Sequence, residues 1–208
     1  MTQTDYQKEH IRQWARTDVP AGHLPVHRWY LRIDDPTQIE AKQPPHKNVS
    51  ITRANNPTIE FYRFLYHSAG EEFLWGDRRR MSDEELLPLI TPETCHLMVL
   101  YEFGTPAGFF ELSFKRPNES HIKYFAMLPG FLGRGLGSYM LSTAIQYAAN
   151  FRPTPLILDT CTLDHESALE NYRKRGFKVY KEKDFTDPDP RLDGTIRVDA
   201  GQHVPLAK

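Results

Sequence analysis

A glycine-rich stretch at residues 130–141, GFLGRGLGSYML, has the composition of an anion-binding turn. Gly133, Gly135 and Gly137 alternate along it, Arg134 lies between the first two, and an apolar helical pattern follows. The first amides of a helix have no partner within the helix and lie at the positive end of its dipole. Glycines let a phosphate approach those amides closely, because they carry no Cβ atom. The stretch favours a phosphate-binding turn, although the same glycines would also permit a sharp corner between a strand and a helix.

Two common nucleotide-binding motifs do not fit this stretch. A Walker loop closes with Gly-Lys-Ser or Gly-Lys-Thr, and no such tripeptide ends the run. A dinucleotide fingerprint follows the first strand of a parallel sheet, with an acidic residue on the next strand. Here the glycines follow an antiparallel hairpin pattern and no acidic residue stands at the corresponding place.

The elements around the glycines alternate between strand and helix patterns. The order is two strands, two helices, an antiparallel run of strands, a helix, a strand, a helix and a last strand, which predicts one mixed α/β domain. The second helix opens with a Ser82–Glu85 capping box, and Pro92 marks its exit. We expect strands at residues 27–33, 48–54, 95–103, 108–116, 121–128, 155–162 and 177–183, and helices at 56–75, 82–90, 137–149 and 165–175. A turn at 104–107 joins the hairpin strands, and beyond Phe185 we expect an irregular tail on the surface.

Composition limits the class of protein. The 208 residues are 39% hydrophobic and 12% aromatic, enough for a core, and the net charge of −1 gives no electrostatic basis for binding nucleic acid or an anionic membrane. The polar N-terminus lacks the apolar core of a signal peptide, and no apolar run could span a bilayer. Cys95 and Cys161 lie in apolar runs, which predicts buried thiols in a reducing compartment. We therefore expect a cytoplasmic protein without a nucleic-acid or membrane partner, as a monomer or homodimer.

The glycine stretch resembles the acetyl-coenzyme A motif of the GNAT (GCN5-related) N-acetyltransferase superfamily, V-x-P-x-x-[Q/R]-x-x-G-x-G/A. Met127 takes the valine position, Pro129 the proline, and Gly135 and Gly137 the two glycines. Leu132 stands where glutamine or arginine is usual, a position that mostly contributes a backbone amide.

A second stretch, LDHESALENYRKRGF, resembles the later family motif N-x-x-A followed by Y-x-x-x-G-F. Ala168, Tyr172, Gly176 and Phe177 match it, and His165 replaces the usual asparagine. The two motifs cover roughly residues 94–183, and residues 61–86 resemble an uncharacterised branch of small bacterial GNAT proteins.

The resemblance implies a single GNAT-like domain of the α/β (α+β) class. Its sheet is expected to be mixed, mostly antiparallel and twisted, flanked by helices, with a V-shaped splay between the fourth and fifth core strands. The implied organisation is an N-terminal extension at 1–26, an acyltransferase domain at 27–185 and an irregular C-terminal tail at 186–208.

The resemblance also implies acetyl-CoA as cosubstrate. In the family, the pantetheine arm pairs along the strand that ends at the first motif, and the amides of the glycine turn hold the pyrophosphate together with Arg134. The second motif contributes further residues that contact coenzyme A. The implied cofactor-binding residues are Phe125, Ala126, Met127, Leu132, Gly133, Arg134, Gly135, Leu136, Gly137, Ser138, His165, Ala168 and Tyr172.

The implied reaction is direct transfer of the acetyl group to a primary amine of a small molecule or peptide in a ternary complex. Tyr172 is the candidate acid, because a tyrosine with a pKa near 10 is protonated at neutral pH and can donate to a thiolate. A tyrosine that packs the last helix on the sheet is the alternative. His121 and Glu111 are both candidates for the base. His121 could instead begin a strand at the surface, and Glu111 could face solvent by alternation.

The acceptor site is expected near residues 71–80, between the first two helices and the sheet. Glu71 and Glu72 could attract a cation on which Trp75 stacks, and Glu111 could orient the ammonium. The arginines at 78–80 could instead pair with a carboxylate, or the segment could be a solvated connector. Asp164 and His165 are expected to cap the last helix, and the nine histidines show no ligand spacing, so we predict no metal. A catalytically idle coenzyme A sensor and a scaffold without cofactor are the rival functions.

Overall fold

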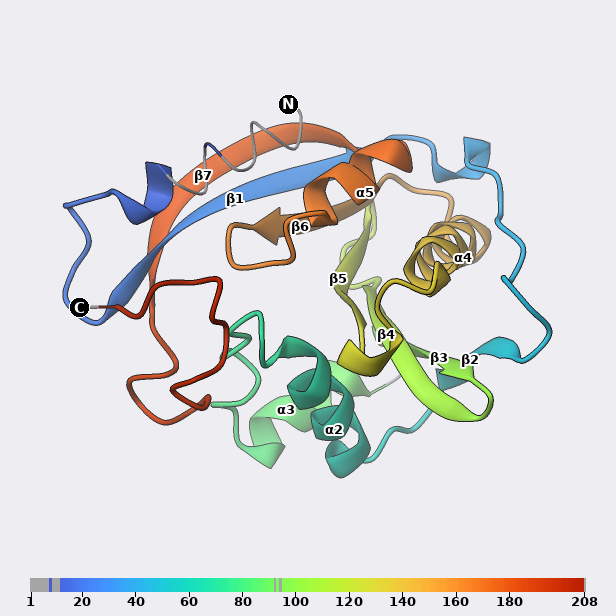
Figure 1. Cartoon of the computed structure of the whole chain (residues 1–208). Coiled ribbons are helices and arrows are strands. Elements are labelled where there is room, and N and C mark those ends of the chain that lie inside the picture. Colours follow the sequence, from blue (N-terminus) through green and yellow to red (C-terminus); the bar gives the residue numbers. More distant parts are fainter. Residues whose placement is uncertain (1–7, 9–11, 92, 94, 208) are drawn as a thin grey trace. The chain divides into compact units, whose positions relative to one another are not determined.

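A computed structural model describes residues 8, 12–91, 93 and 95–207 (Figure 1). Pro92 and the first residues of the predicted extension lie outside the described residues. The chain divides into two compact units. The central unit is Arg32–Ala69 with Met81–Leu158, and the terminal unit is Met1–Leu31, Gly70–Arg80 and Asp159–Lys208.

The central unit contains an antiparallel run of four strands. β2 (Val49–Ala54), β3 (Cys95–Glu102), β4 (Thr105–Ser113) and β5 (Ser120–Met127) pair in that order. The first residues of β6 (Leu156–Cys161) run parallel to the start of β5, with Ser120 opposite Leu156. Its helices are α2 (Ile59–Gly70), α3 (Asp83–Ile90) and α4 (Leu136–Phe151).

The terminal unit is built on β1 (His23–Ile33), β7 (Lys178–Pro188) and α5 (Ala168–Lys174). In sequence, β1 and β6 each run from one unit into the other. The strand order is β2-β3-β4-β5-β6-β1-β7, an open, mixed sheet of seven strands flanked by helices. This order confirms the predicted mixed, mostly antiparallel sheet, and the splay remains a prediction. Within the described parts of the chain, no helix combines the length and apolar composition needed to cross a bilayer.

Local signals explain several element ends. The capping box is present as predicted: Ser82 Oγ accepts from the Glu85 amide at 3.3 Å, and Glu85 Oε2 accepts from the Ser82 amide at 2.9 Å. The β3–β4 turn is shorter than the predicted 104–107. Phe103 and Gly104 both have positive φ, 49° and 79°, and Glu102 pairs with Thr105. Two consecutive positive φ values close a tight hairpin, so β4 begins three residues earlier than expected.

The first long helix is also shorter than predicted, since α2 ends at Gly70 and not at residue 75. A Cβ atom at Gly70 would lie 2.6 Å from the Trp75 ring, so a glycine is needed for the chain to turn back there. The Trp75 amide donates to the Gly70 carbonyl at 3.0 Å. This turn positions Trp75 within the terminal unit.

The C-terminal tail was predicted to be irregular from residue 186 and to lie on the surface, but β7 extends to Pro188 and several later side chains are buried. Asp189, Arg191, Ile196, Ala200 and Val204 are all buried. The apolar members pack in one cluster with side chains of β1 and with Cys161 and Leu163. The surface prediction was wrong for these five residues, because a polar composition does not exclude burial when polar groups are paired.

Both cysteines are free thiols. Cys95 and Cys161 are buried, which confirms the prediction of buried thiols. Burial raises the pKa of the Cys161 thiol far above its ordinary value, and the nearby Asp164 adds to this effect. Cys161 is therefore held as the neutral thiol.

Candidate active site

The glycine turn leaves the start of α4 open. Gly133 and Gly135 have positive φ values of 76° and 77°, and a Cβ atom built on either would meet nothing within 4 Å. Gly135 is the N-cap residue, and no side chain caps the helix there, in contrast to Ser82 at α3. The N-terminus of this 16-residue helix is therefore not capped by its own N-cap side chain, and the turn before it leaves room beside Gly133 and Gly135. This is an arrangement that fits a phosphate group.

The end of β5 is packed closely against the start of α4. A Cβ atom on Gly137 would lie 3.5 Å from Met127 Cγ, and one on Gly108 would lie 2.8 Å from the Ala126 carbonyl oxygen. Glycine at 108 is therefore needed where β4 passes the end of β5. Phe125, Ala126 and Met127 pair with β4, and Leu136, the first residue of α4, is buried.

Leu132 lies at the end of the short 3-10 turn Pro129–Phe131. Its side chain is 49% exposed, and its amide donates to the Pro129 carbonyl at 3.3 Å. The Leu132 amide thus helps to close the turn that presents Gly133, and its predicted contact with coenzyme A remains a prediction.

Arg134 is held by a buried carboxylate that sequence reasoning missed. Its Nη1 lies 2.7 Å from Glu102 Oε2 at the end of β3, and His46 Nε2 lies 2.9 Å from Glu102 Oε1. The hydrogen bonds from His46 and Arg134 keep the pKa of Glu102 below its ordinary value, although burial opposes this effect. The Arg134 guanidinium also lies over the Phe131 ring. Glu102 therefore fixes the one charged residue of the turn.

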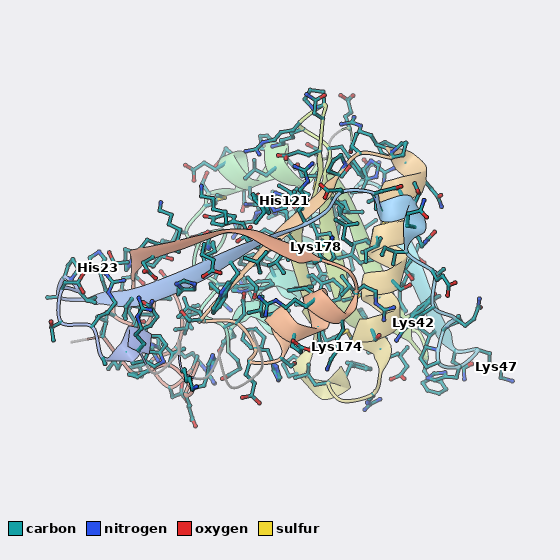
Figure 2. The ribbon with its side chains drawn as sticks, turned by 90° about the horizontal axis from the view of Figure 1, so that it is seen from above. His23, Lys42, Lys47, His121, Lys174 and Lys178 are labelled. Carbon is teal, nitrogen blue, oxygen red and sulfur yellow. The ribbon has the colours of Figure 1, made fainter. Side chains whose placement is uncertain are left out.

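Lys42 was also missed by sequence reasoning. Its Nζ donates to Ser138 Oγ at 2.7 Å in the first turn of α4, and its amide donates to Ser142 Oγ at 2.7 Å. Ser142 in turn donates to the Glu40 carbonyl. Figure 2 shows Lys42 on the segment that passes beside α4. A single lysine in a proline-rich loop carries no sequence signal for this position.

Glu111 is buried, with 2% of its surface exposed. The Tyr62 hydroxyl on α2 donates to Glu111 Oε2 at 3.0 Å, so the alternative in which Glu111 faces solvent is excluded. A bulge in the β4–β5 pairing lies beside it: Glu111 is opposite Tyr124, but Leu112 is opposite Ile122. Bulges of this kind re-aim side chains and are frequent next to active sites.

His121 is the second residue of β5 and is half-buried (Figure 2). It is opposite Ser113 on β4 and Ile157 on β6. The register therefore does not bring it directly opposite Glu111, and the choice between the two candidate bases remains a prediction.

Tyr172 lies on α5 and is buried, with its ring centroid 6.0 Å from that of Phe177. Burial raises the pKa of Tyr172 well above its ordinary value, and the charges of Asp164 and Asp159 raise it further. The hydroxyl therefore stays protonated at and above neutral pH, while the same raised pKa makes it a weaker acid than an exposed tyrosine, and its role as proton donor remains a prediction.

The loop before α5 differs from the prediction, since the N-cap residue of α5 is Ser167 and no side chain forms a capping hydrogen bond there. His165 Nδ1 lies 3.2 Å from the Ser167 amide, and the His165 carbonyl accepts from the Ala168 amide at 2.8 Å. Asp164 does not cap the helix. It accepts from Thr160 Oγ1 at 2.7 Å and from the Cys161 amide at 3.0 Å, because its carboxylate closes the turn that follows β6.

The three residues predicted to contact the acceptor near residues 71–75 have partners within the terminal unit. Glu71 pairs with Arg79 at 3.1 Å and with Arg197 at 2.9 Å. Glu72 Oε2 accepts from the Gly201 amide at 3.1 Å, and Trp75 Nε1 donates to Asp164 at 3.4 Å. These contacts fix the segment against the tail, and its role in substrate binding remains a prediction.

The family model described as "Acetyltransferase (GNAT) family" matches residues 59–177, which is more than half of the chain. The chain belongs to the GNAT acetyltransferase family. The match includes the glycine turn, Glu111 and Tyr172, and it leaves out Lys42, His46 and the tail.

Solved structures with a GNAT fold are similar to this chain. A GCN5-related N-acetyltransferase from Kribbella flavida is 17% identical with a TM-score of 0.56, over 83% of this chain and 63% of that chain. A GCN5-related N-acetyltransferase from Sphaerobacter thermophilus is 17% identical with a TM-score of 0.59, over 79% of this chain and 52% of that chain. An aminoglycoside acetyltransferase from an uncultured soil metagenomic sample is 14% identical with a TM-score of 0.51, over 62% of this chain and 88% of that chain.

At these identities the likeness shows the GNAT fold alone. The chain spans 63% and 52% of the length of the first two structures, and no curated protein matches it. Across the described ranges, no group of three or more His, Cys, Asp or Glu side chains is placed to hold a metal ion.

Proposed function

We propose that this protein transfers the acetyl group of acetyl-CoA to a primary amine of a small molecule or peptide, in a ternary complex. The observation that carries the proposal is the uncapped, open start of α4 behind Gly133 and Gly135, in a chain that belongs to the GNAT family. The buried free thiols support a cytoplasmic location, since such thiols are typical of reducing compartments.

The residues around α4 would bind the phosphates. The amides of residues 133–138 would donate hydrogen bonds to the pyrophosphate oxygens, and Lys42 Nζ, which donates to Ser138 Oγ, would add a positive charge. Arg134 would contribute through the exposed part of its side chain while Glu102 holds it. The pantetheine arm would pair along Phe125–Met127. Bound acetyl-CoA would supply the activated thioester.

Two side chains would move the protons. Glu111 would take a proton from the substrate ammonium and pass it to solvent. The amine nitrogen would then bond to the thioester carbonyl carbon, and the C–S bond would break. Tyr172 would protonate the thiolate sulfur, and the second proton lost by the nitrogen would restore the Tyr172 hydroxyl. His121 is the alternative to Glu111 as base.

The first test is binding followed by turnover. Acetyl-CoA at about 100 times its Kd should stabilise the fold by about 2.7 kcal/mol, so the melting temperature should rise measurably. Release of the coenzyme A thiol should then depend on the amine, in a panel of amino acids, polyamines, aminoglycosides and peptides. A thermal shift without release with any amine would support the idle sensor, and no shift would overturn the proposal.

Lys42→Ala should weaken acetyl-CoA binding by about 5- to 10-fold, because an exposed charged contact to a phosphate contributes about 1 kcal/mol. Isothermal titration with acetyl-CoA measures this effect, and titration with the 3′-dephospho form shows which phosphate is contacted. Lys47→Ala, at an exposed position of the same segment, is the control and should leave the Kd within about twofold of the unmutated value. An unchanged Kd for Lys42→Ala would remove Lys42 from the site.

A further inference from the structure

Glu111 lies in surroundings that are unfavourable for a carboxylate. Only 2% of its surface is exposed, and the side chain of Tyr62 on α2 lies against its carboxylate. A carboxylate taken out of water is costly unless hydrogen bonds compensate. Such a group is retained where a partner satisfies it and, in enzymes, where its proton affinity is used.

Tyr62 is a hydrogen-bond partner of the Glu111 carboxylate. It is fully buried on α2, and its hydroxyl donates to Glu111 Oε2 at 3.0 Å. The donor is a neutral phenol. In the buried pair Asp189–Arg191, by contrast, a guanidinium compensates the charge of the carboxylate. The Tyr62 hydroxyl thus fixes the direction of one Glu111 carboxylate oxygen and, as a neutral donor, adds no positive charge of its own.

The position of Tyr62 is itself fixed by other rings. Tyr62 stacks on Tyr66 at 6.0 Å between centroids, and Tyr66 meets the edge of Tyr124 at 5.1 Å. Tyr124 is opposite Glu111 in the β4–β5 register, next to the bulge. The rings of Tyr62, Tyr66 and Tyr124 thus contact one another in series, and the last of them belongs to the residue paired with Glu111. Packing of this kind locks a side-chain rotamer and so the direction of its hydroxyl.

We propose that Tyr62 is a positioning residue for the acetyl transfer: its hydroxyl holds the Glu111 carboxylate in the orientation that accepts the proton of the substrate ammonium. This inference rests on the proposed function. Tyr62 acts through Glu111 and forms no bond with the substrate. The proton passes from the ammonium nitrogen to a Glu111 oxygen, and the Tyr62 hydroxyl keeps its own proton throughout.

The test is a double-mutant cycle in the full chain, with the amine that gives the highest rate in the panel. Glu111→Gln should lower kcat by about 100-fold or more, and Tyr62→Phe by about 10-fold. The double variant should match Glu111→Gln within about twofold, because the hydroxyl has no carboxylate left to orient. Both replacements preserve shape, and melting temperatures measured on each variant show that it is folded.

A second acetyl acceptor distinguishes a positioning role of Tyr62 from a role in packing alone. Hydroxylamine is largely uncharged at pH 8, so it needs no proton acceptor before attack, and the loss caused by Tyr62→Phe should shrink to about twofold with it. Tyr101→Phe on β3 is the matched control and should keep the original kcat with both acceptors.

Additive losses in the double variant, an unchanged kcat for Tyr62→Phe, or an equal loss with hydroxylamine would each overturn the inference. Failure of the proposed function itself looks different, since the unmutated protein would then release no coenzyme A with any amine.

Discussion

Replacement of Tyr172 with phenylalanine is expected to lower kcat by about 100-fold at saturating acetyl-CoA and amine, because the departing thiolate loses its proton donor. Burial and the charges of Asp164 and Asp159 raise the pKa of Tyr172, so the hydroxyl is protonated at every pH at which the protein would be assayed. Phenylalanine keeps the ring and its contact with Phe177, so the fold should be preserved. Steady-state release of coenzyme A measures the effect.

The controls separate proton donation from binding and packing. The Kd of acetyl-CoA, measured by titration calorimetry, should change by less than about fivefold, since one neutral hydroxyl contributes at most about 1 kcal/mol to binding. Tyr180→Phe, at an exposed position on β7, should have the original kcat. If Tyr172→Phe turned over at the original rate, Tyr172 would be a core residue and the thiolate would be protonated by another group or by solvent.

Replacement of Arg191 with alanine is expected to lower the free energy of unfolding by about 3 to 5 kcal/mol. Arg191 and Asp189 are both buried, and the guanidinium forms a two-pronged contact, with Nη2 2.7 Å and Nε 2.9 Å from the carboxylate oxygens. The same guanidinium donates to the carbonyls of Val204 at 2.9 Å and Pro205 at 2.8 Å. Its loss would leave a buried carboxylate and several carbonyls without their donor.

Chemical denaturation measures this loss, and Arg197→Ala is its control. Arg197 pairs with Glu71, but its side chain is 65% exposed, so its removal should cost less than about 1 kcal/mol. Limited proteolysis should cut the Arg191→Ala variant within residues 189–207 before it cuts the unmutated protein. Equal stability of the two variants would show that the tail is held by its apolar side chains alone.

The Asp189–Arg191 pair also predicts the direction of a pH effect. Although burial acts to raise it, the hydrogen bonds from Arg191 hold the pKa of Asp189 below its ordinary value. The pair therefore stabilises the fold above the unfolded-state pKa of aspartate, near 3.9, and this stabilisation is lost as the pH falls through the lower folded-state pKa.

Much of the fold could be predicted because it depends on neighbours in the chain. The capping box at Ser82 and Glu85 acts within one turn, and the strand patterns reflect burial of alternate residues. The glycine turn was predictable for the same reason: Gly133 and Gly135 adopt positive φ values, and a helix begins directly after them. The two motifs that indicated the GNAT family are likewise short stretches with characteristic spacing, and the family match confirms them.

The sequence by itself thus determined the element order, the turn that fits a phosphate, and the family. The tertiary structure alone decided which side chains meet. Tyr62 with Glu111, Lys42 with Ser138 and Arg134 with Glu102 each join residues far apart in the chain. Contacts between distant segments leave no periodicity and no local propensity in a single sequence. The tail shows the same limit, because its polar composition predicted exposure until the pairing of Arg191 with Asp189 and with backbone carbonyls made burial favourable.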